Sequence, residues 1–190
     1  MKPLINLIMY VCFRPEVIGR ENIPKSGRVV LAGTHTKWLD SPLLIAVNKR
    51  QVHFMAKCEL FKGPLKVFMN GMGCIPVDRK RKDRDSLIRA KEVLKNDGMI
   101  GIFPEGTINR GTGLILPFKI GAVKMSNDTD AVIVPFVITG KYKWFRKSVR
   151  IEFLKSRKIS NNLDYENEKL MKVISKKVSD YRKGEINEKR

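Results

Sequence analysis

The sequence predicts an α/β fold: a single layered domain with a largely parallel or mixed central sheet flanked by helices. First, short β-like apolar runs alternate along the chain with segments of helical periodicity, a pattern typical of layered α/β proteins. Second, no linker, repeat or low-complexity stretch divides the 190 residues, a length typical of one domain. Third, 43% of the residues are hydrophobic, which excludes a disordered chain and supports a core without disulfides or metal.

The predicted elements follow one another in a regular order. After a loop at 19–27, the apolar run at 29–32 predicts a buried strand. Ser41-Pro42 then opens a helix that continues to Val47, because proline is tolerated in the first helical turn. Further along the chain the patterns predict a strand at 52–56, a helical stretch at 65–68, an extended segment at 74–77, a helix at 85–95 stopped by Asn96-Asp97-Gly98, and strands at 99–103, 132–138 and 149–153.

Both ends of the chain are predicted to form amphipathic helices. Residues 160–183 place one apolar stripe along a long helix, and residues 1–13 contain an uncharged run of eleven residues, from Pro3 to Phe13. A helix needs roughly 20 apolar residues to span a bilayer, so we expect no spanning segment here, and no signal-peptide cleavage site follows the run. The first helix therefore either lies in a membrane interface or docks on the core, and the pattern leaves both open.

The net charge of +19 predicts an anionic partner. It is uneven: residues 49–95 carry +8 and residues 141–190 carry +9, whereas residues 1–48 carry +3 and residues 96–140 carry −1. Charge alone does not distinguish nucleic acid, anionic lipid and a phosphorylated small molecule. A nucleic-acid-binding module remains an alternative, but the chain has no zinc spacing, no RNP-like aromatic motif and no obvious basic recognition helix.

The cysteines predict neither disulfides nor a metal site. Cys12, Cys58 and Cys74 are odd in number and include no C-x-x-C pair, which favours a reducing compartment and a role as core filler. We expect no metal and no bound cofactor.

His35 and Asp40 lie in the loop after the first predicted buried strand, and chemistry in α/β folds collects beyond the carboxyl ends of strands. A turn there could fold the Asp40 carboxylate onto the imidazole, which would fix the tautomer and stabilise the imidazolium, as a general base requires. Alternatively, His35 is a structural histidine and Asp40 only caps the next helix.

A second loop, after the strand at 99–103, contains Glu105 followed by Gly106, beside which a ligand could approach the backbone closely. Glu105 is either functional or part of a solvated turn. Between the two loops, an extended segment delivers Arg79 to its carboxyl end, at the head of the basic run 79–84. That run is either a solvated basic turn, or its first residue, Arg79, could bind a phosphate through two hydrogen bonds of its guanidinium.

Taken in order, these stretches resemble the 1-acylglycerol-3-phosphate acyltransferases, the glycerolipid acyltransferases with an H-x4-D motif. The resemblance covers roughly residues 19–140, and the motif-bearing core is 29–140. Thr34 and Lys37 depart from the family, which usually has Asn and Ser there. The matching motif residues are His35 and Asp40; Gly73, Ile75, Val77 and Arg79; Phe103-Pro104-Glu105-Gly106-Thr107 with Arg110; and Val134-Pro135.

The resemblance implies transfer of a fatty acyl group from acyl-CoA or acyl-carrier protein to the sn-2 hydroxyl of lysophosphatidic acid, forming phosphatidic acid. A lysophospholipid acyltransferase for another head group is the alternative. His35 would be the general base and Asp40 its partner, without a covalent intermediate, and no G-x-S-x-G motif is present. Arg79 would bind the acceptor phosphate and Glu105 the glycerol, aided by Gly106 and Thr107, with Arg110 and Lys119 as further candidates.

Such lipid substrates lead us to expect peripheral attachment at the cytoplasmic face of the cell membrane. The N-terminal apolar run and the two basic blocks would bind an anionic phospholipid surface, with roughly 1 kcal/mol contributed by each Lys or Arg close to it. No nucleic-acid partner is expected.

Overall fold

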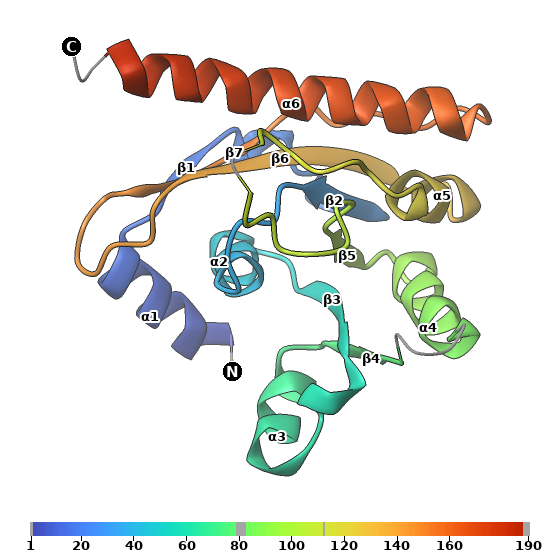
Figure 1. The fold of residues 1–190 in the computed structure, drawn as a ribbon. Coiled ribbons are helices and arrows are strands. Elements are labelled where there is room, and N and C mark those ends of the chain that lie inside the picture. The colour runs from blue at the N-terminus through green and yellow to red at the C-terminus, as the bar shows by residue number, and fades with distance from the viewer. Residues whose placement is uncertain (1, 79–82, 112, 188–190) are drawn as a thin grey trace.

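A computed structural model describes residues 2–78, 83–111 and 113–187, which form a central sheet covered by helices on both faces (Figure 1). The sheet of these residues has seven strands in the order β1-β7-β6-β2-β5-β3-β4. Neighbouring strands run parallel except β6 and β7, which form an antiparallel hairpin. The predicted α/β class with a largely parallel sheet is therefore confirmed. The strands are β1 (Glu16–Ile18), β2 (Val29–Gly33), β3 (Val52–Lys57), β4 (Ile75–Val77), β5 (Met99–Ile102), β6 (Val132–Gly140) and β7 (Val149–Phe153).

Two apolar clusters hold the helices against the sheet. Strand β2 shows why, because Val29 and Leu31 point into one cluster and Val30 and Ala32 into the other, as the two-residue period of a strand requires. The first cluster includes buried residues of α1, α2 and α3, and the second includes those of α4, α5 and α6. The helices are α1 (Lys2–Phe13), α2 (Asp40–Val47), α3 (Gly63–Gly71), α4 (Arg84–Lys95), α5 (Gly121–Asp128) and α6 (Leu163–Asn187).

Helix α1 has two apolar faces. One matches the expectation that this helix docks on the core, and the other matches the expectation that it lies in a membrane interface. Ile5, Met9 and Phe13 are buried in the first cluster. A second stripe, which we call the α1 apolar face, is 45–62% exposed and consists of Leu4, Leu7, Ile8 and Val11. Among the described helices, none combines the length and apolar character needed to cross a bilayer.

The structure differs from the sequence prediction in several details. Strand β1 was not predicted, because three residues are too few to show a periodicity. Helix α6 begins at Leu163 rather than at residue 160, and its predicted stripe is buried at Leu170, Ile174 and Val178. Cys74 is buried in the core and Cys12 packs against it, but Cys58 belongs to neither apolar cluster, so the core-filler prediction is wrong for that residue.

Parallel pairing brings the two candidate loops together. β2 pairs with β5 on one side and with β6 on the other, with Ala32 opposite both Ile102 and Pro135. Since parallel strands end at the same edge, the loops after β2 and β5 both leave the sheet at this point, whereas β6 continues past it to Gly140, paired with β7. The candidate site lies here.

Candidate active site

His35 and Asp40 form a hydrogen-bonded pair at the carboxyl edge of the sheet. His35 follows β2, Asp40 is the first residue of α2, and Nδ1 of the histidine lies 3.0 Å from Oδ2 of the aspartate. The loop turns back so that a five-residue offset, which would separate the side chains on a straight helix, brings them into contact. The alternative role of Asp40 as a helix cap does not apply, because the N-cap position is Leu39 and has no side-chain cap bond.

The Asp40 carboxylate is fully buried, and hydrogen-bond donors reach both of its oxygens. Oδ2 accepts hydrogen bonds from the backbone N–H groups of Thr36 (2.5 Å) and Lys37 (2.8 Å). Oδ1 accepts a hydrogen bond of 2.7 Å from the Tyr142 hydroxyl. A buried carboxylate must be compensated by such donors, and this one has them on both oxygens.

These donors also determine the histidine tautomer. Because Asp40 acts as an acceptor throughout, the His35 Nδ1 carries the proton and donates it, which leaves Nε2 with an available lone pair. No side chain or backbone group of the described residues hydrogen-bonds to Nε2. The ring stacks on Phe103 at a centroid distance of 3.9 Å, which restricts its rotation. The pair can thus accept a proton from a substrate hydroxyl or water.

Glu105 holds the backbone on both sides of the site. Its carboxylate is only 4% exposed; Oε1 accepts a hydrogen bond from the His35 N–H (3.0 Å) and Oε2 one from the Leu116 N–H (2.8 Å). The Asn109 N–H donates to the His35 carbonyl at 2.8 Å. Glu105 is therefore not in a solvated turn, and the loop after β5 binds both the backbone N–H and the backbone carbonyl of His35.

Four of the other predicted site residues, Gly106, Thr107, Arg110 and Lys119, lie within the described part of the chain. Gly106 has φ +70°, and the Lys119 side chain crosses it so closely that a Cβ there would lie 2.9 Å from Nζ. Thr107 and Arg110 are exposed on the same loop. Arg79 lies outside the described residues.

Thr34, where the family usually has Asn, also has a definite role. Its buried hydroxyl oxygen accepts a 2.9 Å hydrogen bond from the Ile138 N–H, which ties the His35 loop to β6.

Tyr142 is the residue that sequence reasoning missed. It lies 102 positions from Asp40, beyond the end of β6, and nothing in its local sequence marks it as functional. Burial, together with the charge of Asp40, raises the pKa of Tyr142, so its hydroxyl stays protonated and donates. Only the register of β6 against β2 could have brought it to the pair.

For the acyl transfer expected from the sequence, the Tyr142→Phe variant should have a kcat about tenfold or more below that of the wild type. The KM for each substrate should change little. The substitution removes a hydrogen bond to a buried charge, worth about 1.5–3 kcal/mol, while keeping the ring that packs on Phe13. Steady-state kinetics measure the two constants separately. Tyr165→Phe, at an exposed position on α6, is the matched control and should change neither. An unchanged kcat in Tyr142→Phe would show that Tyr142 does not position Asp40.

Comparison with known proteins shows the family to which this chain is similar. The family model described as Acyltransferase matches residues 14–139, which include both loops and most of the sheet. The chain is 34% identical over 127 residues to the 1-acyl-sn-glycerol-3-phosphate acyltransferase of Bacillus subtilis, covering 66% of this chain and 62% of that protein. It is also 34% identical over 136 residues to the enzyme of that name from Borreliella burgdorferi, covering 70% and 54%. The chain thus matches somewhat more than half the length of these relatives.

A solved structure supports the fold. The crystal structure of a 1-acyl-sn-glycerophosphate acyltransferase from Thermotoga maritima superposes with a TM-score of 0.77 at 21% sequence identity. The superposition covers 95% of this chain and 79% of that one.

Proposed function

The chain belongs to the acyltransferase family, and on that basis we propose that it transfers a fatty acyl group from a thioester to the sn-2 hydroxyl of 1-acylglycerol-3-phosphate. Relatives at 34% identity carry the name of this activity. The observation that carries the proposal is the His35–Asp40 pair, with its buried carboxylate and its available Nε2 at the carboxyl edge of the sheet.

The pair supplies the proton transfers that this reaction needs. An alcohol is a weak nucleophile, so Nε2 of His35 takes the hydroxyl proton while the hydroxyl oxygen attacks the thioester carbonyl carbon. Asp40 stabilises the imidazolium that forms. The carbon–sulfur bond then breaks, the new ester remains on the glycerol, and the departing thiolate takes the proton from His35. The histidine returns to its starting state without a covalent acyl-enzyme.

Acceptor binding is proposed for the loop residues of the family motifs. Arg79 would bind the phosphate, and Glu105 the glycerol, with Gly106 and Thr107 beside it. Each Glu105 oxygen already accepts one backbone hydrogen bond but retains a second lone pair for such a contact. Arg110 and Lys119 are the further candidates for the phosphate.

The proposed function is tested by thiol release from the purified protein with lysophosphatidic acid as acceptor. Acyl-CoA and acyl-carrier protein are compared as donors, and lysophospholipids with other head groups as acceptors. Phosphatidic acid should form together with the free thiol. Faster transfer to another lysophospholipid would identify that lipid as the acceptor instead. No transfer to any of the acceptors would refute the proposal.

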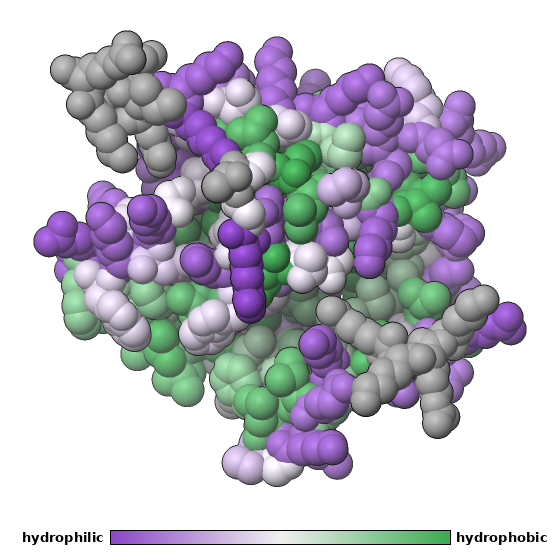
Figure 2. Space-filling view, in the orientation of Figure 1, coloured by the Kyte–Doolittle hydropathy of each residue, from purple (hydrophilic) through white to green (hydrophobic). Residues whose placement is uncertain are grey.

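We also propose that the protein attaches peripherally to anionic membranes, at the cytoplasmic face of the cell membrane. The α1 apolar face is exposed, and Figure 2 shows hydrophobic residues at the surface over α1, at the lower left. The β6–β7 loop adds an exposed aromatic side chain near the C-terminal end of α1, since the ring centroid of Trp144 (65% exposed) lies 5.0 Å from that of Phe13. That loop also carries exposed Arg146 and Lys147, so apolar and basic groups meet at one end of α1.

Replacing Leu7 and Val11 together with serine is expected to lower binding to vesicles of phosphatidylglycerol and phosphatidylcholine at least tenfold. Each change removes an exposed apolar side chain from the proposed contact without touching the core. Sedimentation with vesicles measures the partition. The matched control replaces Leu87 and Ile88, which are similarly exposed on α4, and should leave binding unchanged. Equal losses in both variants would contradict a specific role for α1.

A further inference from the structure

A cavity of about 680 Å³ lies beside the His35 loop on the side of α6. Its walls come from three places: the β6–β7 loop, the loop after β5, and the C-terminal half of α6. Thr34 and Thr36, the neighbours of His35 on either side, line its inner end. The volume is within the range that binds organic ligands, and its position connects it directly to the proposed catalytic pair.

The charge of this cavity is unusual, even for so basic a chain. Lys37, Arg110, Lys141, Lys143 and Arg182 line it, and no Asp or Glu is among the described lining residues. Within the described part of the chain, Lys37, Arg110, Lys141 and Lys143 form no ion pair with a carboxylate. Cations in a concave site reinforce one another and concentrate anions there. The cavity is therefore suited to a ligand that carries several negative charges.

The walls are held by hydrogen bonds that keep the cations in place. The Ser148 hydroxyl donates to the Lys141 carbonyl (2.6 Å), and Nη2 of Arg182 donates to the Gly113 carbonyl (2.9 Å) across the gap between α6 and the loop after β5. Glu152, on the adjacent strand, is neutralised by Lys177 at 2.8 Å and accepts from the Tyr181 hydroxyl. Burial and this carboxylate raise the pKa of Tyr181 to about 12, so the phenol at the cavity wall remains neutral.

We propose that this cavity binds the nucleotide end of coenzyme A, through the 3′-phosphate and the diphosphate of the acyl donor. The inference rests on the proposed function and names the donor it uses. Three phosphate groups match the lining cations other than Arg110, which are Lys37, Lys141, Lys143 and Arg182, better than the single phosphate of the acceptor does. The pantetheine arm then leaves the cavity past Thr34 and Thr36, which brings the thioester to His35.

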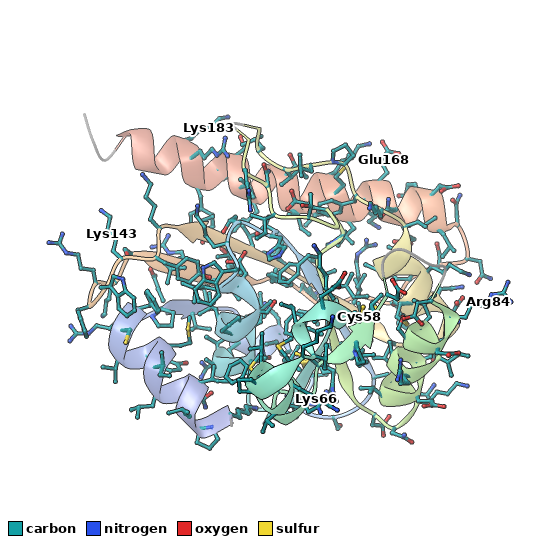
Figure 3. All side chains as sticks on the ribbon, turned by 60° about the horizontal axis from the view of Figure 1, so that its bottom comes forward. Cys58, Lys66, Arg84, Lys143, Glu168 and Lys183 are labelled. Carbon is teal, nitrogen blue, oxygen red and sulfur yellow. The ribbon has the colours of Figure 1, made fainter. Side chains whose placement is uncertain are left out.

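The arrangement of the layers supports a donor rather than an acceptor here. α6 covers one face of the sheet and α1, with its exposed apolar face, packs on the other, as Figure 1 shows. A lipid acceptor would arrive from the side of the α1 apolar face. Two of the cavity's walls, α6 and the loop after β5, are not part of the proposed membrane contact, and coenzyme A is water-soluble and needs none. Figure 3 labels Lys143, on the β6–β7 loop that lines the cavity, and Lys183, which follows the lining residue Arg182 on α6.

The test is equilibrium binding of coenzyme A by isothermal titration calorimetry to the wild type and to a variant with Lys141→Ala and Lys143→Ala. We expect the double variant to weaken binding roughly 30- to 100-fold, about tenfold or slightly less for each lost contact to phosphate. The matched control removes two exposed cations near α3, Lys62→Ala with Lys66→Ala, and should bind like the wild type. Dephospho-coenzyme A should bind more weakly than coenzyme A to the wild type, and glycerol 3-phosphate should bind equally to all three proteins.

Binding requires no turnover, so its outcome is separate from that of the acyl-transfer assay. Variant-sensitive binding of coenzyme A without acyl transfer would uphold this site and refute the proposed function. If the wild type transferred acyl groups from acyl-carrier protein but did not bind coenzyme A, the proposed function would be upheld and this site would be refuted. Equal loss in the two double variants, or a loss confined to glycerol 3-phosphate, would overturn the donor site.

Discussion

Replacing His35 with alanine is expected to lower kcat for acyl transfer by roughly 10²–10⁴-fold, the usual contribution of a general base, and to leave the protein folded. Among the described residues, the imidazole of His35 is the group that could take the hydroxyl proton while hydrogen-bonded to a buried carboxylate. Without it, the attacking hydroxyl keeps its proton and the departing thiolate receives none. Thiol release in the presence of lysophosphatidic acid measures the loss.

His53, the other histidine of the chain, provides the matched control. It lies on β3, and its Nδ1 is 2.8 Å from the Gly73 carbonyl, a structural contact away from the pair. His53→Ala should retain most of the wild-type kcat, even if its thermal unfolding temperature falls. If purified and folded His35→Ala kept activity within tenfold of the wild type, the proton-transfer mechanism would be abandoned.

Replacing Asp40 is expected to affect both activity and stability. Asp40→Ala leaves two backbone N–H groups, the His35 Nδ1–H and the Tyr142 hydroxyl without their acceptor in a fully buried place. Each orphaned donor costs about 1–3 kcal/mol, so the total is a large share of the stability of about 5–15 kcal/mol that a domain has. Denaturant unfolding should show this loss.

Asp40→Asn separates catalysis from folding. The asparagine amide keeps the volume of the carboxylate and one acceptor oxygen. Its NH₂ group, however, cannot accept from the donors that contact Asp40, and the neutral amide has no charge to stabilise the imidazolium. We expect kcat to fall by roughly 10²–10⁴-fold in a protein that still folds, as for other histidine bases that lose their carboxylate. Asp128→Asn, which alters a surface pair with Lys91, is the control and should remain active. Full activity of Asp40→Asn would remove the carboxylate from the mechanism.

The elements that could be predicted were those with enough residues to reveal a period. The apolar runs of β2, β5 and β6 and the stripe of α6 are long enough to identify the element and its buried face. β1 is not, because its pairing with β7 comes from distant residues rather than from its own three. Leu87 shows what a period alone leaves undecided: it follows the helical period of α4 but is 46% exposed, whereas Ala90 and Leu94 are fully buried.

The H-x4-D pair was predictable because both residues lie in one loop between a strand and a helix, so a single turn decides whether they meet. The sequence by itself determined the α/β class, and it predicted this pair and, from the net charge, an anionic partner. Only the tertiary structure decided that Tyr142 binds Asp40, that Glu105 holds the His35 backbone, and that cations from three loops and α6 line one cavity. Those contacts join residues far apart in the chain, and their positions depend on strand order and register, which no local pattern encodes.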